Sequence, residues 1–249
     1  MIGRIFGIAA LAGLMAGIPA AAEEIAPGLE RDAFRAEVRA YLLENPEVIL
    51  EAIRILEQRR KLAEATAELD LVRAHAEELR NDGYSHVAGN PDGSLTVVEF
   101  FDYRCGYCKR AHPDVKTLIR TNPDIRFVMK EFPILGPESL TAARAAMAAL
   151  RQGGKIYEDF SDRLMSFGGA LTDAVIDRLA ERSGVDVARM RADMDSPEIT
   201  AELERTRKLA EALRIGGTPT FVIGDKIVRG FVPLDEMTRV VELARRAQD

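Results

Sequence analysis

The 249-residue sequence contains no tryptophan, and aromatic side chains make up only 6% of it. Surfaces that bind single-stranded nucleic acid usually stack bases on aromatic rings, so this composition argues against such a partner. The formal net charge of −6 argues against nucleic acid as well, because that binding depends on cationic side chains that neutralise phosphates. With 47% hydrophobic and 30% charged residues, the chain has the composition of a globular protein of one or two domains.

Cysteine is also scarce, with only Cys105 and Cys108 in a Cys-x-x-Cys arrangement. A structural disulfide that closes so small a loop would restrict the unfolded chain very little. A tetrahedral zinc site usually needs four protein ligands, but there is no second cysteine pair, and His75, His86 and His112 lack zinc-finger spacing. The pair therefore indicates redox chemistry, with a soft ion such as Cu(I) or an incidental pair as alternatives.

The N-terminus predicts an export signal. Arg4 precedes an apolar run from Ile5 to Ile18, and Pro19 and the three alanines at 20–22 form a cleavage pattern. We expect residues 1–22 to be removed after about Ala22, in a compartment where disulfides persist. An uncleaved membrane anchor is the alternative, but the run is shorter than the about 20 residues of a spanning helix. No later segment is apolar enough to span a membrane.

Residues 23–84 are predicted to form a helical oligomerisation region. Asn45 and Pro46 suit the start of a new helix within it. A weak heptad spacing follows in two rows, which are Ile55, Leu62, Leu69 and Ala76, and Ala65, Val72 and Leu79. A helix with so many charged residues buries little apolar surface by itself, and we therefore expect it to pack against another copy of the chain. A helix that folds back on its own domain is the alternative.

Residues 85–249 have an alternating pattern that indicates the α/β class. The expected elements are a strand at Leu95–Phe101, a helix from Cys105 to about Arg120, a strand at Ile125–Phe132, a helical block at about 138–214, two short strands at Thr220–Ile223 and Lys226–Arg229, and a closing helix at Pro233–Ala247.

A Cys-x-x-Cys pair that follows a strand and opens a helix suits thiol–disulfide exchange. The first sulfur lies at the helix N-terminus, where unpaired N–H groups and the helix dipole favour a thiolate. The second sulfur lies one turn along and is able to release a substrate held in a mixed disulfide. Arg104, Lys109 and Arg110 add positive charge nearby. His112, seven residues after Cys105, is expected to be an ordinary surface residue, and support of a Cys–His nucleophile is the alternative.

Three segments of the chain resemble the DsbA-like thioredoxin-fold proteins of the bacterial periplasm. They are Val97–Pro113 (VVEFFDYRCGYCKRAHP), Val128–Gly136 (VMKEFPILG) and Gly217–Gly224 (GTPTFVIG). The resemblance covers residues 85–249 and implies a thioredoxin fold with an inserted helical domain at about 138–214. Tyr41–Ile53 (YLLENPEVILEAI) resembles the N-terminal region of the ScsC group, which is associated with suppression of copper sensitivity and includes trimers and monomers.

The resemblance also implies roles for individual residues. Cys105 is the expected nucleophile and Cys108 the resolving cysteine. Glu99 matches the buried acid that assists proton transfer to Cys108, and burial is expected to raise its pKa. Pro219 matches a cis-proline that faces the sulfurs, and Thr218 before it helps to dock extended substrate through backbone pairing.

Gly106 and Tyr107 are implied to tune the redox potential. The strongest oxidases of the family have Pro-His at these positions, so Gly-Tyr predicts a less stabilised thiolate and a less oxidising disulfide. Gly-Tyr, together with Thr218 before Pro219, is similar to the pattern of the disulfide isomerases.

We therefore predict a periplasmic thiol–disulfide isomerase or reductase that acts on cysteine-containing client proteins. It is expected to need no cofactor beyond the Cys105–Cys108 pair and no metal. The resemblance implies a membrane thiol reductase of the DsbD/ScsB type as redox partner, and a homo-oligomer such as a trimer. The alternatives are a DsbA-like dithiol oxidase and a Cu(I)-binding protein of copper tolerance.

Overall fold

The computed structural model describes residues 31–247, so the predicted export signal and its cleavage site lie outside the described residues. The chain divides into two units at Arg59 and Arg60. Helix α1 (Arg31–Glu44) belongs to the first unit, and helix α2 (Glu47–Ala74) continues through the division.

The first unit is helical, as the sequence predicts, and leaves apolar side chains in solvent. Helix α1 has no buried residue, although Phe34, Val38 and Tyr41 follow one another at helical spacing and are all exposed. In α2, Ile49 and Ile53 repeat this arrangement one turn apart and are exposed as well. Within the described chain these apolar faces have no cover.

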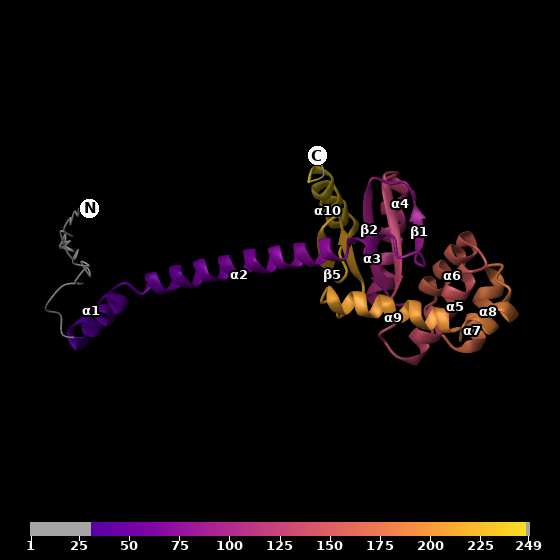
Figure 1. The fold of residues 1–249 in the computed structure, drawn as a ribbon, viewed down its shortest axis with the longest axis horizontal. Helices are drawn as coiled ribbons and strands as arrows, with labels where there is room; N and C mark the ends of the chain where they lie inside the picture. Colours follow the sequence, from indigo (N-terminus) through magenta and orange to yellow (C-terminus); the bar gives the residue numbers. More distant parts are fainter. Residues whose placement is uncertain (1–30, 248–249) are drawn as a thin grey trace, which may run out of the picture. The chain divides into compact units, whose positions relative to one another are not determined.

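The second unit is built on a five-stranded sheet (Figure 1). Its strands are β1 (His86–Gly89), β2 (Leu95–Phe101), β3 (Ile125–Glu131), β4 (Thr220–Ile223) and β5 (Lys226–Arg229). The order across the sheet is β1-β3-β2-β4-β5, in which β2 and β3 are parallel and the other pairs are antiparallel. Four strands were predicted and β1 was not, because its four residues contain no buried apolar run.

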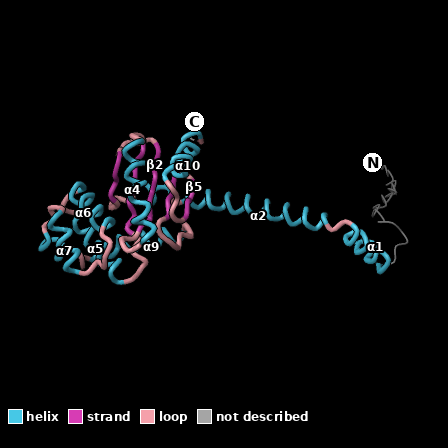
Figure 2. The backbone as a smooth tube through the Cα atoms, turned by 180° about the vertical axis from the view of Figure 1, so that it is seen from behind, coloured by secondary structure: helices cyan, strands magenta, loops and turns pink. Residues whose placement is uncertain are grey.

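Side chains alternate between the two faces of the sheet along each strand, so both faces carry apolar side chains, and helices cover both. Helices α4 (Gly106–Thr121) and α10 (Leu234–Arg246) cover one face and share a core with Val97, Phe127 and Phe221. Val98 and Phe100 point to the opposite face, which is covered by α9 (Pro197–Ala212) and α3 (Ala76–Arg80). Figure 2 shows α4, α9 and α10 from behind.

A helical block is inserted between β3 and β4, as the resemblance to thioredoxin-fold proteins implies. It consists of α5 (Pro137–Leu150), α6 (Gly154–Ser166), α7 (Asp173–Arg182), α8 (Val187–Asp193) and α9. Helix α5 packs against the other four helices. Its buried positions are mostly alanines, and such small side chains allow the neighbouring helices to approach closely.

The end of the N-terminal helical region packs onto this second unit. Val72 and Leu79 are buried in the same core cluster as Val98 and Phe100. The heptad rows predicted to face another copy are therefore divided: Leu62 is exposed, whereas Val72 and Leu79 pack against the sheet of their own chain. The core of the second unit thus begins before residue 84, where the sequence predicts the end of the N-terminal region.

Cations of strand β3 hold helix α3 in place. Lys130 donates to the Glu78 carbonyl (2.8 Å) and Arg126 donates to the Arg80 carbonyl (2.7 Å), at the helix end where carbonyls lack helical partners. The fully buried Lys130 also pairs with Asp82, just beyond the helix. Burial alone would raise the pKa of Asp82, but the charge of Lys130 and the hydrogen bonds from Lys130 and Ser85 together outweigh it, and the pKa is lowered.

Candidate active site

The loop that carries the cysteines is organised by Asp102, the first residue after strand β2. Its Oδ1 accepts hydrogen bonds from the Arg104 N–H (2.7 Å) and the Ser139 hydroxyl (2.8 Å). Its Oδ2 accepts from the backbone N–H groups of Ile134 (2.8 Å) and Leu135 (3.0 Å). These four bonds satisfy a buried carboxyl group and fix the loop to the start of α5. Asp102 was not singled out from the sequence, although an acid directly after a buried strand is visible there.

Cys105 is the N-cap residue of α4, and its backbone N–H donates to the Asp102 carbonyl (3.0 Å). Its sulfur accepts a hydrogen bond from the Cys108 backbone N–H (3.3 Å). The hydrogen bond with the Cys108 side chain, followed by one with Thr218 and by the backbone N–H groups of Cys108 and Tyr107, lowers the pKa of Cys105 to about 5 against the opposing effect of burial. At neutral pH the thiolate, which is the attacking species in disulfide exchange, is the main form.

Cys108 is buried behind Cys105 and has the opposite protonation preference. The hydrogen bond with Cys105, burial and the charge of Glu99 together raise the pKa of the Cys108 thiol far above its ordinary value. Cys108 is 1% exposed and Cys105 is 6% exposed, so Cys105 is the sulfur that a second molecule reaches more readily. Both cysteines are free thiols in the structure.

Glu99 is buried in β2 and interacts electrostatically with both cysteines. Burial, together with the charge of Cys105, raises the pKa of Glu99 to about 8. A carboxyl group with such a pKa gains and loses a proton near neutral pH, which suits general acid–base chemistry beside Cys108.

Thr218 and Pro219 lie beside the cysteine pair, although they are more than a hundred residues away in sequence. The Cys105 sulfur lies 3.2 Å from the Thr218 carbonyl oxygen, to which it donates when it is protonated. The Thr218–Pro219 peptide bond is cis, as predicted. The structure therefore brings the two predicted substrate-docking residues to the predicted nucleophile.

The three cations near the cysteines in sequence bind groups other than the Cys105 sulfur, and the two residues between the cysteines are exposed to solvent. Tyr107 is 62% exposed, and a Cβ atom at Gly106 would meet nothing within 4 Å, so packing does not demand glycine there. The three nearby cations have other partners: Arg104 pairs with Glu138 (3.0 Å), Lys109 donates to the Phe167 carbonyl, and Arg110 lies over the Phe231 ring (4.5 Å). The thiolate is therefore stabilised by Cys108, Thr218 and backbone N–H groups and not by these cations.

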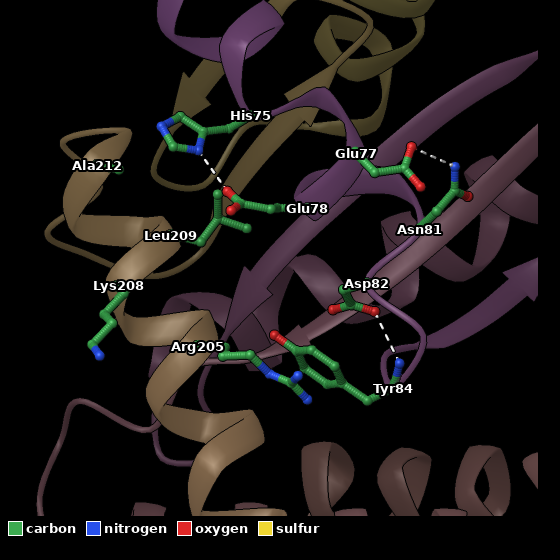
Figure 3. Close-up of a pocket in the computed structure, with 10 residues that line it drawn as sticks. All are labelled: His75, Glu77, Glu78, Asn81, Asp82, Tyr84, Arg205, Lys208, Leu209 and Ala212. Atoms are coloured by element: carbon green, nitrogen blue, oxygen red, sulfur yellow. Dashed lines mark hydrogen bonds and ion pairs between the residues drawn. The ribbon is translucent and has the colours of Figure 1, made fainter.

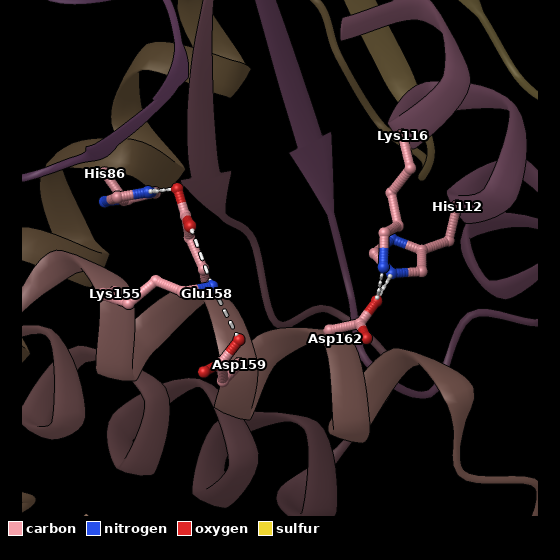
Figure 4. A network of polar contacts seen from close by, with 7 residues as sticks. All are labelled: His86, His112, Lys116, Lys155, Glu158, Asp159 and Asp162. Atoms are coloured by element: carbon pink, nitrogen blue, oxygen red, sulfur yellow. Dashed lines mark hydrogen bonds and ion pairs between the residues drawn. The ribbon is translucent and has the colours of Figure 1, made fainter. Parts of the chain in front are cut away.

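His112 is not the ordinary surface residue that the sequence suggests. Its Nε2 lies 2.7 Å from Asp162 Oδ1 in helix α6, and Lys116 donates to the same oxygen at 2.6 Å (Figure 4). The side chain of His112 is only 18% exposed. Sequence spacing could have indicated this position, because His112 follows Cys108 by one helical turn on the same face.

A buried acid in strand β3 was also missed. The Tyr103 and Tyr157 hydroxyls donate to Glu131 Oε1 at 2.7 Å and 2.8 Å, while Oε2 has no partner among the described residues. Burial raises the pKa of Glu131 to about 8, although the two tyrosine hydrogen bonds oppose the shift. The available signal was the pair of charged residues, Lys130 and Glu131, directly after the apolar run Phe127–Met129 of this strand.

Apart from the cysteine site, the second unit has a cavity of about 490 Å³ beside α3 and α9 (Figure 3). No cysteine lines this cavity, and several of its polar side chains make hydrogen bonds with one another, as in the pairs His75–Glu78 (2.5 Å) and Asn81–Glu77 (3.2 Å). Among residues 31–247, no group of three or more His, Cys, Asp or Glu side chains could hold a metal ion. The cysteine pair therefore remains the candidate active site.

The N-terminal helical region and the thioredoxin-fold region of the chain are each similar to known protein families. Residues 96–242 match the DSBA-like thioredoxin domain, and residues 30–63 match the N-terminal domain of the copper resistance protein ScsC. A thioredoxin-like oxidoreductase from Silicibacter pomeroyi is 44% identical over 68% of this chain and 97% of its own, with a TM-score of 0.66. BcfH from Salmonella enterica Typhimurium is 31% identical over 86% of this chain and 95% of its own, with a TM-score of 0.70.

A curated relative is much longer than this chain. The Na⁺/H⁺ antiporter NhaA of Herminiimonas arsenicoxydans is 30% identical over 98% of this chain, which spans only 39% of the antiporter. Among residues 31–247 of this chain, no helix has both the length and the apolar character needed to cross a bilayer.

Proposed function

The chain belongs to the family of DSBA-like thioredoxin domains, and we propose that it is a thiol–disulfide oxidoreductase that reshuffles or reduces disulfides of client proteins. The contrast between the two cysteines carries the proposal. Cys105 has a lowered pKa of about 5, whereas Cys108 is buried with a strongly raised pKa. A nucleophile ionised at neutral pH beside a protonated partner is suited to form a mixed disulfide before the partner reacts.

The proposed reaction begins when the Cys105 thiolate attacks one sulfur of a client disulfide. The Cys105–client bond forms, the client disulfide breaks, and the other client sulfur leaves as a thiolate. In isomerisation, another client thiolate attacks the mixed disulfide and regenerates the Cys105 thiolate. In reduction, Cys108 gives its proton to ionised Glu99 and attacks Cys105, which oxidises the enzyme pair by two electrons and releases the reduced client.

Substrate docking is proposed for the segment around the cis peptide bond. The Thr218 carbonyl lies 3.2 Å from the Cys105 sulfur, so a chain that pairs with the backbone of Thr218 and Pro219 would lie beside the nucleophile. Gly106 and Tyr107 separate the cysteines, and we propose that they tune the redox potential.

The direction of the reaction is proposed from the degree of thiolate stabilisation. Thiolates of this fold have pKa values from about 3.5 in the strong oxidase DsbA to about 7 in thioredoxin. The Cys105 value of about 5 lies between them, which favours a less oxidising pair than that of DsbA. Such an enzyme needs a reductant, and we propose a membrane thiol reductase of the DsbD/ScsB type in the periplasm.

Refolding of scrambled ribonuclease tests the activity. The parent protein should restore ribonuclease activity in a redox buffer, Cys105→Ser should not, and Cys108→Ser should retain reshuffling while losing net reduction. A reduction potential near about −180 mV would support an isomerase, whereas one near about −120 mV would support the alternative dithiol oxidase. Absence of reshuffling by the parent would contradict the proposal.

We also propose that the exposed apolar faces of α1 and α2 associate with other copies, for example as a trimer. Several active sites around one client would suit an isomerase. Light scattering on Ile53→Ser should show a smaller assembly than the parent, whereas Glu51→Ser in the same helix serves as the control. A parent protein that is monomeric at all concentrations would refute self-association.

Copper binding is a second candidate because residues 30–63 match a domain of a copper resistance protein. The two sulfurs would be the ligands, since thiolates favour Cu(I). Titration of the reduced protein with Cu(I) should show binding that Cys105→Ser weakens. Binding that this substitution leaves unchanged would exclude the cysteine pair as the copper site.

A further inference from the structure

A cavity of about 430 Å³ connects buried Glu99 with the surface of the second unit. Glu99 and Met129 are paired in register on β2 and β3, and both line the cavity. Residues of helix α4 form another wall, and residues of α6 form the third. Its lining is largely apolar but includes several charged side chains, and a cavity of this volume has room for several water molecules, so it provides a path between Glu99 and solvent.

Glu99 requires such a path in the proposed reaction. Each time Cys108 gives it a proton, Glu99 has to lose that proton before the next turnover. Within residues 31–247 its carboxyl group makes no direct hydrogen bond, and the side chain is almost fully buried. The proton therefore has to leave through the cavity to a group that is closer to solvent.

His112 lies where such a group is needed. It follows Cys108 by four residues, so both side chains lie on the same face of α4, one turn apart. His112 lines the cavity together with Glu99, and it is bound to Asp162, whose side chain is 41% exposed. Of all side chains, imidazole is the one best suited to take up and release a proton near neutral pH.

We propose that His112, oriented by Asp162, carries protons between Glu99 and bulk solvent during the exchange reaction. This role rests on the proposed functions of Cys108 and Glu99. After Cys108 has passed its proton to Glu99, the protonated carboxyl releases it through cavity water to the free nitrogen of His112. The imidazolium then releases a proton to solvent, and the ionised carboxylate is restored.

Apart from Glu99, the charged groups that face His112 come from α4 and α6. Asp162 Oδ1 lies 2.7 Å from His112 Nε2 and also accepts a hydrogen bond from the Lys116 ammonium. The other charged groups that line the cavity are Arg120 of α4 and Lys155, Glu158 and Asp159 of α6.

His86 provides a matched control. Its Nε2 lies 3.0 Å from Glu158 Oε1, so it also pairs with a carboxylate of helix α6 (Figure 4). His86 does not line the cavity that contains Glu99. Loss of a histidine–carboxylate pair is thus common to substitutions at both positions, whereas loss of a proton path is specific to His112.

The experiment follows the two steps of the reduced full chain with 5,5′-dithiobis(2-nitrobenzoate) in a stopped-flow instrument. Attack by Cys105 releases the first thionitrobenzoate, and attack by Cys108 releases the second. His112→Ala and His112→Gln should slow the second release at least about tenfold near neutral pH and leave the first unchanged. The second release depends on His112 because the Glu99 carboxyl, whose pKa is raised to about 8, is mostly protonated near neutral pH and has to lose its proton before Cys108 gives up its own. Added imidazole should restore the rate of His112→Ala, and His86→Ala should behave as the parent.

The results distinguish failure of the His112 relay from failure of the proposed proton role of Glu99, on which the relay rests. If Glu99→Gln leaves the second release unchanged, the proton role of Glu99 fails, and the relay fails with it. If Glu99→Gln slows that step but His112→Ala does not, only the relay is wrong. If added imidazole does not restore the second release of His112→Ala, the relay is wrong and His112 has a structural role. The same conclusion follows if His112→Ala slows the second release but His112→Gln does not.

Discussion

Leu79 tests how much of the N-terminal region belongs to the folded second unit. This residue of α3 is 1% exposed and lies in one core cluster with Val98, Phe100 and Val128 of the sheet. Replacing a buried leucine by alanine costs about 2.7–5 kcal/mol, depending on how far the surroundings relax. Helix α3 has only five residues, and Leu79 is its one buried side chain, so we expect the lower end, about 3 kcal/mol.

The measurement is thermal and urea unfolding of Leu79→Ala, followed by circular dichroism. For a unit of this size, 1 kcal/mol corresponds to a change in Tm of about 2–4 °C, so Leu79→Ala should lower Tm by about 6–12 °C. Leu243→Ala in α10 is the matched control, because Leu243 is 50% exposed and its loss should change stability by less than about 0.5 kcal/mol.

A Leu79→Ala protein as stable as the Leu243→Ala control would refute the packing of α3 on the sheet.

The same reasoning applies to truncation of the chain from its N-terminus. A chain that begins at Arg60 keeps Val72 and Leu79 and should fold, whereas one that begins at residue 85 uncovers the sheet and leaves Lys130 without Asp82. Equal stability of the two truncated chains would place the boundary near residue 84 after all.

Three further predictions concern buried charges. Asp82→Ala should destabilise the protein by about 3–5 kcal/mol in urea unfolding, because it leaves the buried Lys130 without a partner. The Glu99 pKa is raised from 4.5 to about 8, so its contribution to stability is full below about pH 4.5 and is lost as the pH rises through about 8. The reduced protein should lose on the order of 3–5 kcal/mol over this range, and Glu99→Gln should lose less. Tyr157→Phe removes a hydrogen bond to Glu131 and should cost about 1 kcal/mol at pH 6, and more above pH 8, where the carboxylate is ionised.

Each of these predictions has a result that contradicts it. Full stability of Asp82→Ala would mean that Lys130 finds water or another partner. An identical pH dependence in the parent and in Glu99→Gln would assign the slope to other groups, such as Glu131. A cost of Tyr157→Phe that does not change with pH would mean that Glu131 keeps one protonation state throughout.

Local sequence patterns account for most of the elements. The apolar run of β2, the Cys-x-x-Cys pair at the helix start, and the turn residues before β4 and β5 are signals that act over a few residues, and the structure agrees with all of them. Strand β1 could not be predicted in this way, because its pairing partner, β3, lies almost forty residues away and its own residues carry little apolar signal.

The sequence alone determined the candidate cysteine pair, the α/β class and the helical nature of both inserted and N-terminal segments, since helix periodicity and the preference for a thiolate at a helix start are local properties. Only the tertiary structure decided that Val72 and Leu79 pack against their own sheet, that Asp102 orders the active-site loop, and that His112 and Glu99 line one cavity. These facts depend on which distant segments meet, because burial and pairing change the pKa and the exposure of a side chain without altering its local sequence.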